Sequence, residues 1–258
     1  MVTTFPGSAR VEMVNGIRVS VDIRTALPRR ELTPLLDNAF AWLHWVDETF
    51  NPLNEDSQIG RLNHGRTIEQ IPELIEVLHR CDELREATGG WFDPRINGVV
   101  DPSGYIKGWA LERLSRGLVM AGAGDHRVNA GGDIRLRGSA APGKPWSVEI
   151  RDPHTGLVRR VVHGHDLGIA TSGAARIVDP HTGRRQRGLS SVTVLGPDLG
   201  VADAYATALF AMGPVAARHF AADLAEGPYQ TMIVERDGRE VSTPGFAEYG
   251  EPPARLAG

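Results

Sequence analysis

Residues 16–24 read Gly-Ile-Arg-Val-Ser-Val-Asp-Ile-Arg, and residues 31–50 read Glu-Leu-Thr-Pro-Leu-Leu-Asp-Asn-Ala-Phe-Ala-Trp-Leu-His-Trp-Val-Asp-Glu-Thr-Phe. The first stretch carries an apolar side chain at every second position, which is typical of a half-buried strand. The second carries apolar side chains three and four residues apart, which is typical of an amphipathic helix. The chain therefore mixes strands and helices from its first elements.

Both kinds of element continue without a regular alternation. The patterns predict helices over residues 72–88, 107–116, 201–212 and 214–224, strands near 133–137, 146–150 and 192–195, and a closing hairpin of 231–234 and 240–242. This order favours an α+β fold over a doubly wound parallel sheet. No Pro-rich or Ser-rich linker divides the chain, so we expect one domain over residues 1–258, with a loose tail over 244–258.

The composition is that of an ordinary globular protein, with 41% hydrophobic and 23% charged residues. The net charge of −4 gives no general attraction to nucleic acid or anionic lipid, although Arg184, Arg185 and Arg187 form a local basic cluster. The single cysteine, Cys81, excludes an internal disulfide and a thiolate zinc site. We see no apolar run of transmembrane length and no signal-peptide pattern, which predicts a cytoplasmic protein without membrane insertion.

One short motif occurs twice. Asp-Pro-His-Thr-Gly spans residues 152–156 and again residues 179–183. Asp-Pro followed by Thr-Gly favours a tight turn, so we expect two similar turns.

Asp203 and Thr207 lie four residues apart in a predicted helix, which places a carboxylate and a hydroxyl on one face. Such oxygen donors suit Mg²⁺, which completes its shell with water and phosphate oxygens. A structural interpretation stays open, with Asp203 as a helix N-cap and Thr207 bonded back to the carbonyl of Asp203.

Two segments of small residues have the character of a nucleotide contact. Gly131 and Gly132 stand at the start of a predicted strand, where they allow close approach of a phosphate to backbone N–H groups. Thr171 and Ser172 precede Gly173 in a similar segment. Taken alone, an ordinary tight turn or bulge explains the first segment better, and a simple turn of the chain is the alternative for the second. The sequence contains neither a Gly-x-Gly-x-x-Gly fingerprint nor a P-loop, so neither standard nucleotide fold is indicated.

Residues 101–110 place Asp101 six positions before Lys107, across a turn into a helix. A lysine at a helix start is unfavourable unless an anion lies there, which indicates a phosphate. A lysine directed to solvent is the alternative.

Seven segments, in this order, resemble the ApbE-like family of FAD:protein FMN transferases, once called thiamine-biosynthesis lipoproteins. They are residues 51–63, 90–94, 101–110, 128–133, 169–173, 179–183 and 202–207. The resemblance implies a flavin cleft between two intimately packed halves of one domain. It also implies magnesium-dependent transfer of FMN from FAD to a Ser or Thr hydroxyl of a partner flavoprotein, with release of AMP.

The resemblance assigns roles to matching positions. Asp203, Thr207 and the carbonyl of Gly104 would hold magnesium. The residues that would contact FAD are Trp91, Phe92, Asp93, Asp101, Lys107, Gly131, Gly132, Thr171 and Ser172.

The chain departs from the family pattern at two places. Leu53 stands where the family often has an aromatic residue, and Arg176, in a shortened segment, stands where the family has a histidine thought to assist the acceptor hydroxyl. Arginine could grip phosphate instead, with nearby His181 as the alternative base. Two other functions therefore stay open: an FAD pyrophosphatase, with water as the acceptor, and a non-catalytic FAD-binding protein.

Overall fold

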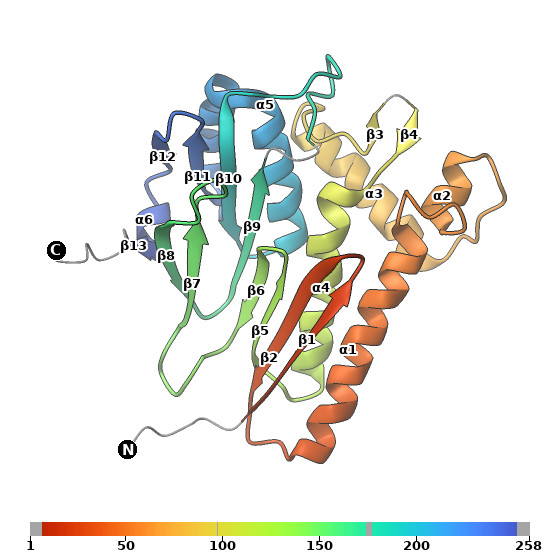
Figure 1. The fold of residues 1–258 in the computed structure, drawn as a ribbon, viewed down its shortest axis with the longest axis vertical. Helices are drawn as coiled ribbons and strands as arrows, with labels where there is room; N and C mark the ends of the chain where they lie inside the picture. Colours follow the sequence, from red (N-terminus) through yellow and green to blue (C-terminus); the bar gives the residue numbers. More distant parts are fainter. Residues whose placement is uncertain (1–6, 97, 174–176, 252–258) are drawn as a thin grey trace.

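The computed structural model describes residues 7–96, 98–173 and 177–251. Its centre is an eight-stranded sheet in the order β1-β2-β5-β6-β9-β10-β11-β12, in which every pairing is antiparallel (Figure 1). The strands are β1 (Gly7–Val14), β2 (Ile17–Arg24), β5 (Asp125–Ala130), β6 (Asp133–Arg137), β9 (Leu167–Gly173), β10 (Leu189–Gly196), β11 (Gln230–Glu235) and β12 (Glu240–Ser242).

Two smaller sheets and the helices complete the fold. The small sheets are β13-β8-β7, from β7 (Trp146–Arg151), β8 (Val158–Gly164) and β13 (Gly250–Glu251), and the pair β3 (Arg95–Ile96) and β4 (Val99–Val100). The helices are α1 (Arg29–Phe50), α2 (Gln58–Asn63), α3 (Pro72–Ala87), α4 (Ser103–Met120), α5 (Leu199–Ala225) and α6 (Phe246–Tyr249). The mixture confirms the predicted α+β class.

The large sheet is covered on both faces. One hydrophobic cluster lies between the sheet and helices α1, α3, α4 and α5. A second lies between the opposite face of β6, β9, β10 and β11 and the sheet of β7 and β8. All eight residues of β10 are buried because this strand lies between the two clusters. The side of the sheet that carries α4 and α5 also carries the predicted metal ligands.

The boundaries of two helices differ from the sequence-based expectation. Helix α4 runs from Ser103 to Met120 rather than over 107–116, because Gly104 and Gly108 pack closely against α5 and do not interrupt the helix. Helix α5 is one element with a kink at Gly213, where φ is 75° and ψ is 174°. The sequence predicts two helices here, and the kink at Gly213 lies at their predicted boundary.

Helix α5 is long and apolar enough to span a membrane by length and composition, contrary to our reading that no run reaches this length. Most of it, 67% of the qualifying window, is buried inside the protein, so it serves as the central core helix. The absence of membrane insertion stays a prediction.

The predicted loose tail is wrong for residues 246–251. Phe246, which begins α6, is 1% exposed and packs in the second cluster, and β13 pairs with β8. A large aromatic side chain supplies enough buried apolar surface to fix such a short segment. Residues 252–258 lie outside the described part of the chain.

The repeated motif forms two equivalent turns, as predicted. The N–H of Gly156 donates to the carbonyl of Asp152, and the N–H of Gly183 donates to the carbonyl of Asp179. Both glycines have positive φ, 69° and 66°. The turns differ in what the aspartate side chain binds, and this difference concerns the candidate site.

Candidate functional site

Glycines determine how closely α4 and α5 approach. A Cβ on Gly108 would lie 2.5 Å from the carbonyl oxygen of Leu199 and 2.8 Å from the Cα of Gly200, so no larger residue fits at this crossing. Gly200 in turn packs against Tyr105 and Trp109 of α4. The crossing brings the first turns of α4 beside residues 203–207 of α5.

The three predicted metal ligands meet at this crossing. The N–H of Gly108 donates to Oδ2 of Asp203 at 3.2 Å. A Cβ on Gly104 would lie 3.0 Å from Oγ1 of Thr207, and Ser172 Oγ lies 3.4 Å from the same hydroxyl. The carboxylate of Asp203, the hydroxyl of Thr207 and the backbone of Gly104 thus come together from two helices.

Asp203 is not a helix cap. The N-cap of α5 is Asp198, whose carboxylate accepts a hydrogen bond from the N–H of Val201 at 3.0 Å. Asp203 lies one turn further on, with only 5% of the residue exposed. Burial raises the pKa of Asp203 well above its usual range, the negative charge of Asp133 raises it further, and Lys107 and the N–H of Gly108 oppose both effects. A bound cation would favour the ionised carboxylate at this position.

The donor set fits magnesium better than zinc. Within the described ranges, no group of three or more His, Cys, Asp or Glu side chains is placed to hold a metal ion. A site built from one carboxylate, one hydroxyl and one carbonyl supplies hard oxygen donors and leaves positions for water and phosphate, as Mg²⁺ requires. Asp203, Thr207 and Gly104 therefore fit the implied ion.

Lys107 pairs with a buried carboxylate. Its Nζ lies 2.6 Å from Oδ2 of Asp133, a residue with no solvent exposure, and the N–H of Thr171 donates to Oδ1 at 3.0 Å. Burial lowers the pKa of Lys107, but the charges of Asp203 and Asp133 outweigh it, so the pKa lies above its usual value. Both sequence-based interpretations of Lys107 are corrected, because α4 begins at Ser103 and the side chain is neither at a helix start nor directed simply to solvent.

Gly131 and Gly132 form the two-residue turn between β5 and β6. Their φ angles are 61° and 103°, and the N–H of Gly132 bonds to the side chain of Asn129 at 3.1 Å. Positive φ at both central positions favours glycine in such a hairpin. The turn leads directly into Asp133, which places it beside Lys107.

A second group of predicted residues surrounds a separate hollow. The ring of Trp91 lies 4.5 Å from the ring of His181, at an interplanar angle of 63°. Asp93 and His181 line a cavity of about 350 Å³ together with Arg85, Glu86, Gly89, Gly90 and Pro180. The ring of the buried Phe92 would lie 3.1 Å from a Cβ on Gly104. Phe92 precedes Asp93 in the chain, so the segment that contributes Asp93 to the cavity also packs beside Gly104.

The model of the ApbE family matches residues 15–101 and 97–230. The chain belongs to the ApbE family. The FAD:protein FMN transferase of Rhodobacter capsulatus is 34% identical in an alignment of 277 residues. The alignment covers 83% of this chain and 52% of the relative. That of Escherichia coli K12 is 35% identical over 178 residues, 58% of this chain and 51% of the relative. The chain thus spans about half the length of these curated relatives.

Solved ApbE structures share the fold. The ApbE protein of Thermotoga maritima has a TM-score of 0.88 at 21% identity, covering 95% of this chain and 99% of that one. The flavin transferase ApbE of Vibrio cholerae has a TM-score of 0.78 at 22% identity, covering 95% and 100%. At this identity the likeness establishes the fold, and it confirms the α+β domain predicted from the sequence.

The remaining predicted residues of this ApbE-family chain are placed as follows. Asp101 is exposed and accepts a hydrogen bond from the N–H of Ser103 at 2.9 Å, so it helps to start α4. Thr171 shares a hydroxyl contact of 3.0 Å with Thr193 of β10. Arg176 lies outside the described residues. The flavin cleft between two halves stays a prediction.

Sequence reasoning missed Asp179 and Arg85. Oδ1 of Asp179 lies 3.3 Å from Nδ1 of His181, and Nε of Arg85 lies 3.2 Å from Oδ2 of Asp93. The repeated turn contained a signal for the first contact, because an aspartate that begins such a turn bonds to residues two and three positions later. In the other copy, Asp152 binds Arg159 instead.

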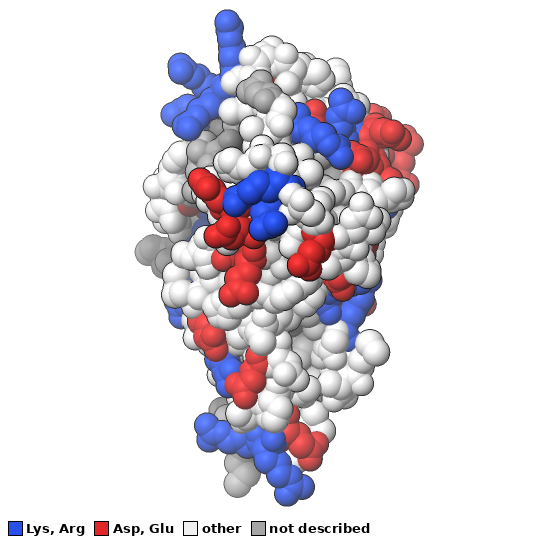
Figure 2. All heavy atoms as spheres, turned by 90° about the vertical axis from the view of Figure 1, so that its right-hand side faces the viewer, with Lys and Arg blue, Asp and Glu red and all other residues white. Residues whose placement is uncertain are grey.

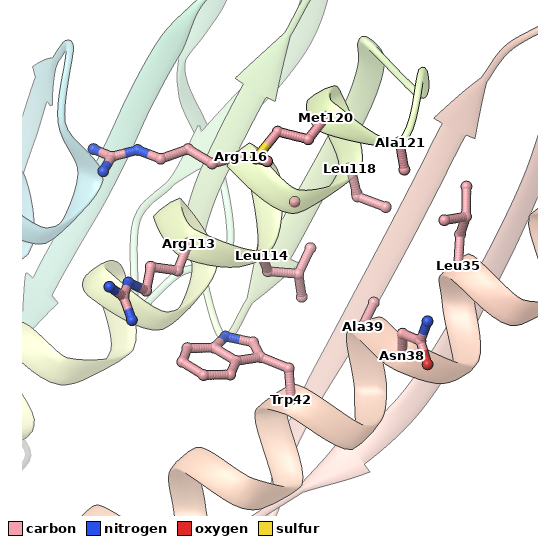
Figure 3. Close-up of a pocket in the computed structure, with 11 residues that line it drawn as sticks. Leu35, Asn38, Ala39, Trp42, Arg113, Leu114, Arg116, Leu118, Met120 and Ala121 are labelled. Atoms are coloured by element: carbon pink, nitrogen blue, oxygen red, sulfur yellow. The ribbon is translucent and has the colours of Figure 1, made fainter. Parts of the chain in front are cut away.

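A larger cavity lies elsewhere. It occupies about 600 Å³ between α1 and α4, and its lining includes Leu35, Trp42, Arg113 and Met120 (Figure 3). No residue that we predicted for FAD or magnesium lines it, so size alone does not identify the candidate site.

Proposed function

We propose that this protein transfers FMN from FAD to a Ser or Thr hydroxyl of a partner flavoprotein and releases AMP, with Mg²⁺ as the metal. The carrying observation is the α4–α5 crossing, which gathers Gly104, Asp203 and Thr207. The names of the relatives, FAD:protein FMN transferases, support the same reaction.

The charges around the crossing suit a pyrophosphate. Magnesium held by Asp203, Thr207 and the Gly104 carbonyl would supply charge neutralisation where the phosphate anhydride breaks. Lys107 adds a positive charge that Asp133 holds in place and that the nearby charge of Asp203 also favours. We assign Asp133 the role of holding Lys107, and Phe92 that of a buried wall next to Gly104.

We assign His181 the role of proton acceptor. The acceptor oxygen attacks the phosphorus of the FMN half, the bond to the bridging oxygen breaks, and AMP leaves with that oxygen. The hydroxyl proton passes to His181, whose Nδ1 is held beside Asp179 and whose Nε2 lies beside Gly90 at the cavity. Arg176 remains our predicted phosphate-binding residue, since a guanidinium stays charged and binds phosphate oxygens.

One observation favours a second function. Arg176 in place of the family histidine is compatible with water as the acceptor, which would give FMN and AMP from the same site. The non-catalytic interpretation is weaker because the chain retains the complete set of oxygen donors. The cytoplasmic location stays a prediction.

One incubation separates these functions. The protein is mixed with FAD, Mg²⁺ and a candidate acceptor flavoprotein, and the products are followed by mass spectrometry. AMP together with an acceptor carrying FMN supports the transferase, while AMP and free FMN support the pyrophosphatase. Asp203→Asn serves as the control without the metal carboxylate. Failure to bind FAD with magnesium present would contradict both enzymes.

A further inference from the structure

A basic loop follows the second turn of the repeated motif. Arg184, Arg185 and Arg187 are all exposed. The acidic residue of this segment, Asp179, is already engaged, since its carboxylate accepts the hydroxyl of Thr182 at 2.7 Å and the N–H of His181 at 2.8 Å. Three positive charges therefore project from one loop of a chain whose net charge is −4.

The guanidinium groups of these arginines have no ion-pair or hydrogen-bond partner among the residues that the structure describes. Many other arginines form ion pairs, such as Arg85 with Asp93, Arg95 with Asp82 and Arg218 with Glu235. Between described residues, no ion pair and no side-chain hydrogen bond includes the guanidinium of Arg184, Arg185 or Arg187. Their charges are thus available to another molecule.

The loop is fixed at both ends. Val178 and Arg185 form an antiparallel backbone bridge, and Oε1 of Gln186 accepts the N–H groups of Gly188 and Leu189 at 2.9 and 3.1 Å. The amide of Gln186 also packs against Gly213 at the kink of α5. A loop held in this way presents its arginines in a defined place, which lowers the entropic cost of binding.

The loop adjoins the candidate site. His181, three residues before Arg184, contacts Trp91 and lines the cavity with Asp93. In Figure 1 the loop lies at the upper end of the molecule, above α5. Figure 2 shows basic side chains projecting at the same end. The three arginines do not line the cavity itself, so their charges lie beside it rather than inside it.

We propose that Arg184, Arg185 and Arg187 form a docking surface for an acidic segment of the acceptor protein, next to its reacting hydroxyl. This inference rests on the proposed function and names the chemistry of its partner. Guanidinium groups bind carboxylates through paired hydrogen bonds, and a complementary charged patch speeds encounter and selects partners. The overall negative charge opposes an extended polyanion such as a membrane or a duplex, whereas it permits a short acidic segment.

The test compares two fluorescein-labelled peptides by anisotropy. One has a central serine flanked by glutamates, and the other has glutamines in their place. The unmodified protein binds the glutamate peptide at least about ten-fold more tightly, and this preference shrinks as salt rises. Arg184→Glu/Arg185→Glu abolishes the preference. Arg29→Glu/Arg30→Glu, which changes the net charge equally on two exposed residues of α1, keeps it.

Several results would overturn the docking surface. The first is equal binding of the two peptides by the unmodified protein. The second is an equal loss of the preference for the glutamate peptide in the two double variants. The third is tighter binding of anionic vesicles or duplex DNA than of the glutamate peptide.

A titration with FAD in each variant completes the design. Loss of FAD affinity only in Arg184→Glu/Arg185→Glu would make the loop part of the FAD site and overturn the proposal. Intact peptide preference without FAD cleavage in the unmodified protein would instead refute the proposed function.

Discussion

Nζ of Lys107 on α4 lies 2.6 Å from Oδ2 of Asp133 on β6, and the other oxygen of this carboxylate accepts the N–H of Thr171 on β9. One buried side chain therefore joins a helix and two strands. Because the carboxylate of Asp203 also acts on Lys107, a single ammonium group is shared by two buried carboxylates. This shared charge makes Lys107 more important to folding than a partly exposed lysine usually is.

We expect Lys107→Met to lower the free energy of unfolding by roughly 3 kcal/mol, because it leaves a buried charge without its partner. Urea denaturation measures this loss. Adding Asp133→Asn should restore part of it, since the uncompensated charge is then gone. A double variant whose loss equals the sum of the two single losses would show that the two side chains do not interact.

Asp203→Asn should abolish magnesium-dependent FAD cleavage while the protein stays folded. The amide oxygen can still accept the hydrogen bond from the N–H of Gly108, so the helix crossing is kept. Removing a buried carboxylate with a raised pKa should leave the thermal midpoint without metal unchanged or higher. Turnover with a range of magnesium concentrations and thermal melts without metal measure the two effects. Retained turnover would remove Asp203 from the metal site.

His126 should make the fold sensitive to acid. Its ring is fully buried, with 2.7 Å contacts from Nε2 to Ser115 Oγ and from Nδ1 to the carbonyl of Ala123. Burial lowers the pKa of His126 from 6.5 to about 4. Between these pH values the unfolded chain therefore binds one proton more than the folded chain. The contribution of His126 to the free energy of unfolding is complete above pH 6.5 and is lost as the pH falls toward 4. The free energy of unfolding falls by roughly 3 kcal/mol over that range.

Chemical denaturation at a series of pH values checks this expectation. His126→Gln should lower stability at neutral pH and remove most of the slope between pH 6.5 and 4. Substitution of the exposed His79 by Gln is the matched control and should leave the slope as it is. An unchanged slope in His126→Gln would show that carboxylates cause the acid sensitivity.

His181→Ala should lower FMN transfer by roughly two orders of magnitude or more and leave FAD binding intact, as expected for loss of a proton acceptor. Quenched assays of AMP release measure the rate. If His181→Ala behaves like the unmodified protein, the hydroxyl proton goes elsewhere.

Arg176→Ala should lower the rate of FAD cleavage by about one to two orders of magnitude, the effect of one charge-assisted contact. The same quenched assays of AMP release measure this rate.

The sequence predicted those elements whose periodicity is carried by large apolar side chains. Helices α1 and α3 and strand β2 are of this kind. Strand β9 was recognised only as a motif, because Gly168, Ala170 and Gly173 give it little hydrophobic pattern. Small residues are needed there, since a Cβ on Gly168 would lie 3.0 Å from the backbone of Leu199. Close packing between elements thus removes the signal on which sequence reading depends.

The candidate site shows the same division. The four-residue spacing of Asp203 and Thr207 predicted their shared face correctly, because the helix alone determines it. The ion pair of Lys107 and Asp133 joins α4 to a strand of the sheet, so no local pattern contained it. The contact of Asp179 with His181 lies within one turn and could have been predicted from the repeated motif.

Gly108→Ala tests whether the close crossing of α4 and α5 builds the metal site. The new Cβ would lie 2.5 Å from the carbonyl of Leu199 and 2.8 Å from Gly200, both backbone atoms that cannot rotate away. The helices must separate, which should cost roughly 1–3 kcal/mol, as overpacking does elsewhere. Separation also moves Gly104 away from Thr207, so we expect a weaker apparent affinity for magnesium in FAD cleavage.

Gly117→Ala on the same helix is the matched control. A Cβ there meets nothing within 4 Å, so the change should raise stability by roughly 0.5–1 kcal/mol through helix propensity and leave magnesium dependence unchanged. Thermal denaturation and magnesium titrations of both variants separate the two effects. A Gly108→Ala protein that is less stable yet keeps its magnesium dependence would show that the crossing supports the core without positioning the ligands.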